Sequence, residues 1–197
     1  MSILQQPFYN RPTLQVVRDL LGKKLVRRLD GCDLSGIIVE TEAYLGRTDS
    51  ACHAHRGRTQ RNDVMFGPPG CAYVYFTYGM HYLLNLVTEE KDVPCAVLLR
   101  ALFPVAGIDR MLARRKRGGK ELTNGPAKLC QALAIDKSFN GWDLTRGKQL
   151  WVEEGLVLAP GAILTTPRIG IDYAAPEDRA APWRFLATLS HFSAALE

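Results

Sequence analysis

The chain has 197 residues, of which 47% are apolar, and its formal net charge is +5, as expected for a globular protein that tolerates an anionic partner. No window approaches the roughly 20 uninterrupted apolar residues of a membrane-spanning helix, and the N-terminus lacks the basic and apolar regions of a signal peptide, so we expect a cytoplasmic protein without a membrane partner. The five cysteines are odd in number and form no C-x-x-C, which disfavours both a disulfide framework and a cysteine zinc site.

The first part of the chain predicts a helix followed by two strands. Residues 12–21 begin with proline, carry apolar residues at helical spacing and stop at a glycine, which predicts a helix of about ten residues. Residues 24–29 alternate in polarity, Asp30-Gly31 is a hairpin-type turn, and residues 34–44 are rich in β-branched side chains. We therefore expect an antiparallel hairpin after the helix.

The middle of the chain predicts a long loop and a second group of strands. Residues 47–69 are polar and interrupted by glycines and prolines, and a loop longer than ~15 residues in a compact domain is usually functional or disordered. Residues 71–87 predict a strand pair that turns at Tyr78-Gly79-Met80, and residues 95–102 form the continuous apolar run of a buried strand.

The last part of the chain predicts two helices and several short strands. Residues 108–117 and 127–134 have helical patterns, and short strands separated by glycine and proline turns follow from Leu150. Strands outnumber helices and join through hairpins. We therefore expect an α+β fold with a mainly antiparallel sheet, in a single domain over residues 1–197.

Two glutamates and a tyrosine share one face of the strand at residues 34–44. Side chains alternate along a strand, so Glu40, Glu42 and Tyr44 point to the same side. A glutamate at the edge of an apolar pocket has a raised pKa and can act as a general base. The simpler interpretation of this segment alone is a solvated sheet face with Tyr44 at its rim.

Arg100 stands inside the apolar strand LLRAL, where an arginine is costly unless it is paired or faces a ligand. Glu40 and Glu42 are the candidate partners. The two interpretations that remain open are a structural ion pair and an arginine that helps a glutamate hold a water molecule.

Tyrosines surround the predicted turn at residues 78–80. Tyr73 and Tyr75 share a strand face, Tyr82 lies across the turn, and Tyr78 sits at the tip. Exposed aromatic rings near basic loops can stack on unpaired bases or wedge into a base step. Ordinary cross-strand packing explains the ladder equally well, but it explains a ring at a hairpin tip less well.

Basic side chains gather at residues 23–28, 56–61 and 110–120. Any one group is most simply a solvated surface, and three such groups interleaved with tyrosines favour nucleic acid. The sequence TNGPAK adds a helix start whose free N–H groups, together with Lys128, could contact a phosphate.

Other chemistries find little support. There is no phosphate-binding P-loop and no zinc-deaminase signature, and His53 and His55 have no evident third ligand. We expect no metal and no cofactor.

The chain closely resembles the alkyladenine (3-methyladenine) DNA glycosylase family in its compact bacterial form. The matching segments run in order over nearly the whole sequence: LVRRL, IVETEAYLG, RN-x-x-MFGPPG, YVYFTYGM, LLRAL, GPAKLCQALAI and RIGI. The resemblance implies a curved, mainly antiparallel sheet with flanking helices and a protruding hairpin.

The resemblance also implies roles for individual residues. Glu42 falls on the general base that activates water, Arg100 on the arginine that positions this water, and the backbone carbonyl of Ile169 on its third contact. Around the flipped base, the matching positions are Tyr44, His53 and Tyr75, with Asn85 disfavouring the exocyclic amino group of normal guanine. Tyr78 falls on the residue that fills the vacated space in the duplex. Contacts to the DNA backbone fall at Arg58, Met80, Lys128 and Lys137.

The activity that the resemblance implies is the excision of damaged purines from duplex DNA. The expected lesions are 3-methyladenine, 7-methylguanine, hypoxanthine and ethenoadenine. The base is flipped out, a glutamate-activated water cuts its N-glycosidic bond, and an abasic site is left without strand nicking. We expect a monomer without an obligate protein partner, associated with the nucleoid through DNA.

Two rival interpretations remain. A glycoside hydrolase would use Glu40 and Glu42 together, but it leaves the basic groups and the hairpin-tip tyrosine unexplained. A non-catalytic nucleic-acid-binding module would use the aromatic and basic residues, but it leaves Glu42 beside Arg100 without a role.

Overall fold

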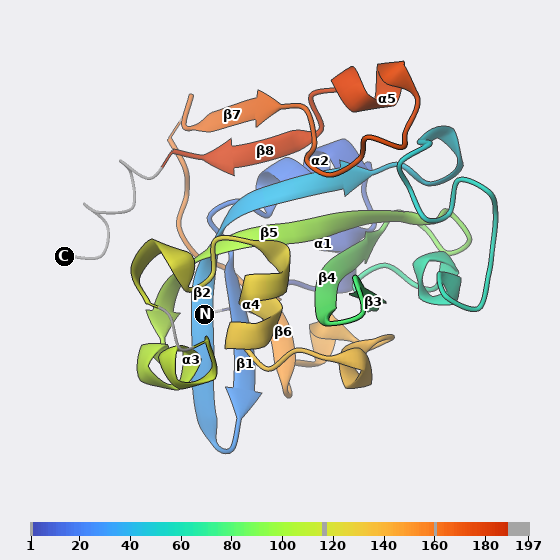
Figure 1. Ribbon diagram of the computed structural model, residues 1–197. Coiled ribbons are helices and arrows are strands. Elements are labelled where there is room, and N and C mark those ends of the chain that lie inside the picture. Colours follow the sequence, from blue (N-terminus) through green and yellow to red (C-terminus); the bar gives the residue numbers. More distant parts are fainter. Residues whose placement is uncertain (1, 116–117, 160, 189–197) are drawn as a thin grey trace.

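Eight strands form one open, curved sheet in this computed structural model, which describes residues 2–115, 118–159 and 161–188. The strands are β1 (Lys24–Leu29), β2 (Cys32–Tyr44), β3 (Ala72–Thr77), β4 (His81–Thr88), β5 (Cys95–Ala106), β6 (Leu150–Glu153), β7 (Ile163–Thr166) and β8 (Arg184–Ala187). Their order is β3-β4-β5-β2-β1-β6, with β8 beside β2 and β7 beside β8 (Figure 1). All of these pairs are antiparallel, so the expected α+β class with a mainly antiparallel sheet is confirmed.

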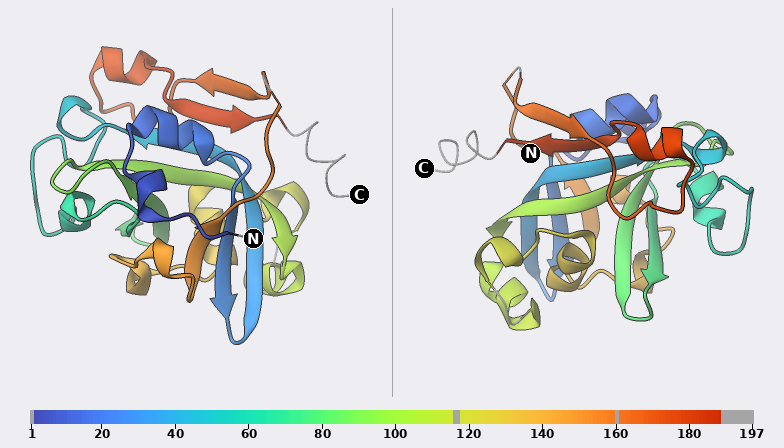
Figure 2. Two further views of the ribbon diagram at one scale, coloured as in Figure 1. Left: turned by 180° about the vertical axis from the view of Figure 1, so that it is seen from behind. Right: turned by 45° about the horizontal axis from the view of Figure 1, so that its top comes forward.

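Helices cover both faces of this sheet. The α-helices are α1 (Gln6–Tyr9), α2 (Thr13–Asp19), α3 (Ile108–Arg115), α4 (Pro126–Ala132) and α5 (Pro176–Ala180), and single turns of 3₁₀-helix lie at Gly46–Thr48, Asp63–Phe66, Gly119–Glu121, Lys137–Phe139 and Leu144–Arg146. The two N-terminal helices pack behind the sheet and α3 and α4 pack in front of it, as the opposite views of Figures 1 and 2 show. None of the helices in the described ranges has the length and apolar character needed to cross a bilayer.

The long strand β2 is the centre of the sheet. One edge of β2 pairs with β5, and the other edge pairs first with β1 through residues 32–37 and then with β8 through residues 40–42. The register with β5 shifts on both sides of Glu40, and such irregularities bend a strand and re-aim its side chains. The bend lets β8 join β2 beyond the end of β1, at the residues that carry the two glutamates.

Apolar side chains from both helical layers meet the sheet in one core. Val16 and Val17 of α2 and Leu129 of α4 are fully buried, as are Leu84 and Leu99 of the sheet. On the rear face, the hydroxyl of Thr41 donates to the carbonyl of Val17 at 3.0 Å. Because Thr41 faces α2, its neighbours Glu40 and Glu42 are directed to the other face.

The predicted elements agree with the structure apart from their ends and two short helices. The strand expected at 95–102 continues to Ala106 through Pro104, which is tolerated because the register with β2 shifts there. The helix expected at 108–117 is described to Arg115, and Lys116 and Arg117 lie outside the described residues. Helices α1 and α5 were not predicted, because segments of four and five residues are too short to show a periodic pattern.

Candidate active site

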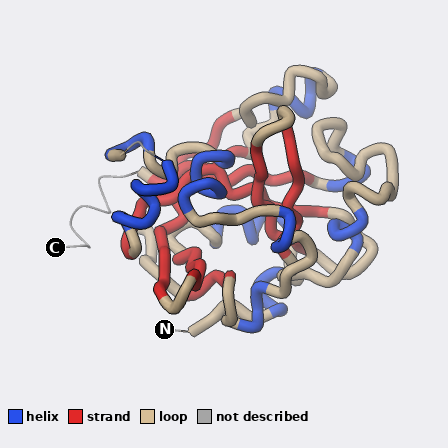
Figure 3. The backbone as a smooth tube through the Cα atoms, turned by 60° about the horizontal axis from the view of Figure 1, so that its bottom comes forward, coloured by secondary structure: helices blue, strands red, loops and turns tan. Residues whose placement is uncertain are grey.

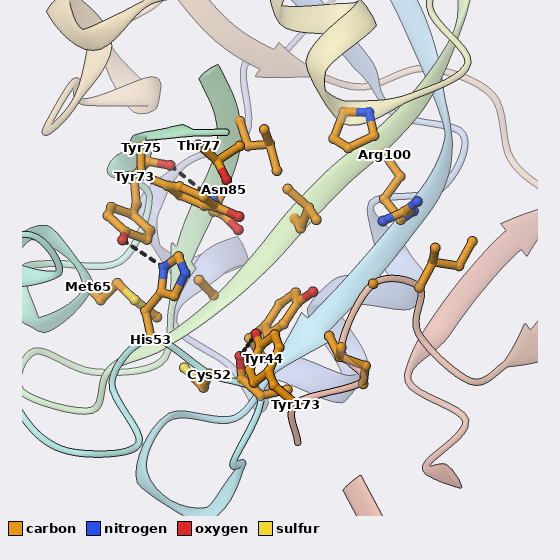
Figure 4. Close-up of a pocket in the computed structure, with 18 of the residues that line it drawn as sticks. Tyr44, Cys52, His53, Met65, Tyr73, Tyr75, Thr77, Asn85, Arg100 and Tyr173 are labelled. Carbon is orange, nitrogen blue, oxygen red and sulfur yellow. Dashed lines mark hydrogen bonds between the residues drawn. The ribbon is translucent and has the colours of Figure 1, made fainter. Parts of the chain in front are cut away.

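A cavity of about 310 Å³ opens between the β3–β4 hairpin, the end of β2 and the segment that follows β7. The loops of the chain gather at this end of the sheet, at the right of Figure 3. Aromatic rings dominate its wall, with Tyr44 and Tyr173 on one side and His53, Tyr73 and Tyr75 on the other (Figure 4). Its volume and its apolar wall with a few polar groups are typical of a site for a small planar molecule.

Glu42 lies directly behind this wall, and its side chain is fully buried (0% exposed). Oε2 accepts hydrogen bonds from the Tyr44 hydroxyl at 3.0 Å and from Arg100 Nη1 at 3.2 Å, while Oε1 accepts one from the backbone N–H of Ile169 at 2.8 Å. The interpretation of this strand face as solvated is therefore wrong for Glu42.

The environment of Glu42 favours a proton acceptor. Burial raises the pKa of Glu42 above its ordinary value, and the nearby Arg100, the Ile169 amide and the Tyr44 hydroxyl offset only part of this shift. A carboxylate has about four lone-pair positions, and donors in the described part of the chain occupy three of them. Among the described residues, Oε1 therefore accepts one hydrogen bond fewer than Oε2, which leaves it a lone pair for a further donor.

Arg100 joins the two glutamates of β2. Its Nε donates to Glu40 Oε1 at 2.8 Å and its Nη1 donates to Glu42 Oε2 at 3.2 Å, so the expected pairing is confirmed with both carboxylates. Glu40 also accepts a hydrogen bond from Arg184 Nε of β8 at 2.7 Å. These bonds fix the planar guanidinium beside Glu42 and at the cavity wall, where it can orient a polar reactant.

His53 and two tyrosines form the opposite wall. His53 Nδ1 shares a hydrogen bond of 2.9 Å with the Tyr73 hydroxyl, and its ring lies 4.5 Å from the Tyr75 ring, centroid to centroid. Burial, with a further contribution from Arg61, lowers the pKa of His53 to about 4, so the ring is neutral at pH 7. Tyr73 and Tyr75 share a face as expected, whereas Tyr82 packs against Phe76 and does not line the cavity.

Asn85 comes from β4 and is buried at the cavity wall, directly across from Tyr73 in the β3–β4 ladder. Its Nδ2 donates to the Tyr73 carbonyl at 3.2 Å, which fixes the amide plane. One face of the amide remains available to the cavity, so the position suits a group that tests the edge of a bound base.

The tip of the β3–β4 hairpin is exposed. Tyr78 is 81% exposed and Met80 is 69% exposed, and Tyr78 also borders the cavity. Tyr78 and Gly79 have φ angles of 51° and 67°, and the N–H of Met80 donates to the Thr77 carbonyl at 3.2 Å. This tight turn presents an aromatic ring to solvent at the mouth of the cavity.

The remaining predicted residues are dispersed around the cavity. Ile169 lines it, and its amide, rather than the carbonyl singled out from the resemblance, contacts Glu42. Arg58 is paired with Asp63 at 2.6 Å, and Lys128 binds Glu121 and Asn124. Lys137 lies exposed in a short 3₁₀-helix. The roles of these cations on a DNA backbone stay predictions.

Two residues of the segment after β7 were not predicted. Tyr173 lines the cavity beside Tyr44 and its hydroxyl donates to the Ala51 carbonyl at 2.8 Å. Arg168 forms a fully buried ion pair with Asp49 at 2.6 Å. Sequence spacing gives no sign of either contact, since the partners are more than 100 residues apart. The motif RIGI marked Arg168 as part of a matching segment without giving it a role.

The ionisable residues show no arrangement typical of a metal site. In the described ranges, no group of three or more histidine, cysteine, aspartate or glutamate side chains is placed to hold a metal ion.

Comparison with known proteins gives a consistent result. Residues 7–191 match the methylpurine-DNA glycosylase family. A protein of Methanocella arvoryzae is 51% identical over 94% of this chain and 92% of its own length, and one of Carboxydothermus hydrogenoformans is 54% identical over 93% and 94%. A third, from Chlorobaculum parvum, is 47% identical over 96% and 90%. All three carry the name "Putative 3-methyladenine DNA glycosylase".

Proposed function

The chain belongs to the methylpurine-DNA glycosylase family and is a DNA glycosylase of base excision repair, and we propose that it hydrolyses the N-glycosidic bond of damaged purines flipped out of duplex DNA. The proposed substrates are 3-methyladenine, 7-methylguanine, hypoxanthine and ethenoadenine. The observation that carries the proposal is the buried Glu42 carboxylate, bonded to Arg100 behind an aromatic pocket and with one acceptor position left on Oε1.

The aromatic walls support binding of a flipped base. A planar base between Tyr44 on one side and the His53–Tyr75 pair on the other would have aromatic contacts on both faces; because the His53 and Tyr75 rings are inclined at 78°, it can stack on only one of these two. Extrusion costs a few kcal/mol, less for a damaged or mispaired base. Because His53 is neutral at pH 7, it does not repel a cationic alkylated purine, and the tyrosine faces attract one.

The hydrolytic step needs only water and the residues already described. The oxygen of a water molecule forms a bond to the sugar C1′ while Glu42 accepts its proton. The bond between C1′ and the base nitrogen breaks, and its electron pair leaves with the base. A cationic purine leaves as a neutral molecule, whereas a neutral lesion must also take up one proton, for which solvent water is the source. Arg100 would orient the water, and the Ile169 carbonyl would provide a further contact.

The exposed hairpin tip supports a role in base flipping. A ring at the position of Tyr78, at the mouth of the pocket, could enter the duplex and fill the space that the flipped base leaves. We propose Met80, Arg58, Lys128 and Lys137 as contacts to the DNA backbone, where cations position a protein without reading its sequence. Asn85 would disfavour the exocyclic amino group of normal guanine.

The direct test is release of free base from a duplex carrying one hypoxanthine or one ethenoadenine. We expect release by the wild-type chain and a fall of at least about 100-fold in Glu42→Gln, with DNA binding retained. Glu153→Gln is the matched control. Like Glu42, Glu153 is a strand glutamate paired with a cation, in its case Lys24, but it lies in β6 at the far edge of the sheet. Normal turnover by Glu42→Gln would refute the general base, and tight binding without release by the wild-type chain would favour a non-catalytic binding module.

We further propose that the enzyme leaves the abasic site intact and works as a monomeric single domain. A strand-nicking glycosylase forms a Schiff base through an amine, and none of the described residues that line the cavity is a lysine. Incubation with substrate and borohydride should therefore trap no covalent adduct. A trapped enzyme–DNA species would contradict this assignment while leaving base release itself unaffected.

A further inference from the structure

The guanidinium of Arg168 is the centre of a buried cluster behind the cavity. Its side chain is fully buried (0% exposed), and Nη1 and Nη2 donate to the two carboxylate oxygens of Asp49 at 2.6 and 2.8 Å. Nη1 also donates to the carbonyl of Ala43 at 2.9 Å, and Nη2 donates to that of Asp178 at 3.3 Å. One side chain therefore ties together the end of β2, the loop after it and helix α5.

Two aromatic rings enclose this guanidinium. Its carbon lies 4.8 Å from the ring centroid of Tyr44 and 4.8 Å from that of Trp183. Tyr44 lines the cavity and Arg168 does not, so Arg168 contacts the face of the ring turned away from the cavity. A planar guanidinium stacks on aromatic faces, so Arg168 fixes the plane of the ring on which the base would rest.

The same arginine is one peptide unit away from the carboxylate. The backbone N–H of Ile169, the next residue, donates to Glu42 Oε1 at 2.8 Å, and the hydroxyl of Tyr44 donates to Oε2 at 3.0 Å. Two of the three donors to Glu42 are thus tied to Arg168. One is the hydroxyl of Tyr44, whose ring stacks on Arg168, and the other is the amide of Ile169, which follows Arg168 in the chain.

We propose that Arg168 is a positioning residue for hydrolysis, which from behind Tyr44 holds the pocket wall and the Ile169 amide in register with Glu42. This inference rests on the proposed glycosylase function and deepens it. A purely structural ion pair is the alternative, and replacing a buried ion pair by apolar side chains is often neutral for stability. The placement of this pair beside the reacting groups gives it a second, measurable consequence.

The consequence is a change in the pH dependence of base release. The charged and titratable groups around Glu42 come from every element packed against it: Glu40 and Tyr44 of β2, Tyr75 of β3, Arg100 of β5, Arg184 of β8 and Arg168 itself. The Ile169 hydrogen bond lowers the pKa of Glu42, so a displaced amide would let that pKa rise. A general base works when it is ionised, and the acid limb of the rate profile would then move to higher pH.

The test is the single-turnover rate of base release by Arg168→Lys, measured across pH on a duplex with one hypoxanthine. Lysine keeps the charge but cannot bind Asp49 through two N–H groups or stack as a plane. We expect the rate constant to fall by about 10- to 100-fold, as small misplacements of reacting groups do, and the acid limb to move to higher pH. Affinity for a duplex carrying an uncleavable abasic-site analogue should stay unchanged.

Arg27→Lys is the matched control. Arg27 is also buried (7% exposed) and stacks on an aromatic ring, with its guanidinium carbon 4.5 Å from the centroid of Phe139, but it does not line the cavity. It should lower thermal stability without changing the pH profile. Asp49→Asn is the second variant, for the case that Arg168→Lys does not fold, and it should move the acid limb in the same direction.

The outcomes separate this inference from the proposed function. Absence of base release by the wild-type chain would refute the function itself, and the inference with it. Release by the wild-type chain, with an unchanged rate and acid limb in folded Arg168→Lys or Asp49→Asn, would leave the function standing and overturn the positioning role. Equal shifts in Arg27→Lys would likewise overturn it, because they would reflect general loss of stability.

Discussion

Glu42 combines full burial with three hydrogen-bond donors to one carboxyl group. A buried carboxylate without partners would become neutral, and one with too many partners would be a poor proton acceptor. Here Arg100, Tyr44 and the Ile169 amide compensate part of the burial, and the pKa of Glu42 remains above its ordinary value. The site therefore retains a base that is stronger than an exposed glutamate, at the expense of folding stability.

Glu42→Gln should for this reason be at least as stable as the wild-type chain at neutral pH. The pKa of Glu42 is higher in the folded than in the unfolded state. Its contribution to stability is therefore complete at pH values below the unfolded-state pKa and is lost as the pH rises through the folded-state pKa. Thermal unfolding of both proteins should give similar Tm values in acid and a higher Tm for Glu42→Gln at pH 7. A lower Tm at pH 7 would show that Glu42 contributes to stability through Arg100.

His53 should show the opposite dependence on pH. Its pKa is lowered by burial and by Arg61 from 6.5 to about 4. The contribution of neutral His53 to stability is therefore complete above pH 6.5 and is lost as the pH falls towards 4. Urea unfolding between pH 7 and 4 should show a smaller acid-induced loss in His53→Gln than in the wild-type chain. Equal losses would place the titration of His53 at its ordinary pH.

At the scale of elements, the β3–β4 hairpin presents a side chain in an uncommon backbone conformation. Positive φ angles at both central residues match the twist of a tight hairpin, and glycine or asparagine usually fills such positions. Tyrosine at position 78 is thus less favourable than glycine for the turn itself. Unfavourable backbone conformations of this kind gather at functional sites, which agrees with a ring placed for contact with DNA.

Tyr78→Ala should weaken binding to a damaged duplex far more than binding to a single strand. Loss of a stacked ring costs about 1–3 kcal/mol, or roughly ten- to a hundredfold in affinity, and only a duplex has a gap to fill. Stability should change little, because the side chain is 81% exposed. Leu164→Ala, at an exposed apolar position on β7, is the control. Equal losses on both forms of DNA would argue against a wedge.

Over the molecule as a whole, the surface charges contribute little to folding stability. Many surface cations already have acidic partners, such as Arg28 with Asp33 and Arg58 with Asp63, and such exposed pairs contribute little to stability. The net charge of +5 would instead attract DNA at long range, independently of its sequence. Binding should consequently weaken with salt for damaged and undamaged duplexes alike.

The logarithm of the DNA association constant should fall linearly with the logarithm of salt concentration. Lys128→Ala and Lys137→Ala should each reduce the slope by about one, because each would remove one phosphate contact. Lys148→Ala is the control, since Lys148 is exposed just before β6, at the opposite edge of the sheet from the hairpin. Titrations at several salt concentrations would measure the slopes, and an unchanged slope in either variant would remove that lysine from the interface.

Most of the strands and helices, and the α+β class of the fold, follow from local patterns in the sequence. Alternation at residues 24–29 and the Asp30-Gly31 turn define β1 and its hairpin, and the apolar run from Cys95 defines β5. These signals are local, because turn residues and side-chain periodicity act within one element. The sequence likewise indicated Glu42, Arg100 and Tyr78 as residues to explain, and the resemblance gave them a common chemistry.

The contacts that bring these residues together come from tertiary packing. The pairing of β8 with β2 and the ion pair of Arg168 with Asp49 join segments more than 100 residues apart. The hydrogen bond from the Ile169 amide to Glu42 likewise spans 127 residues. Local periodicity carries no information on such contacts, because the field and the hydrogen bonds at a buried group come from whichever distant segments the sheet brings against it.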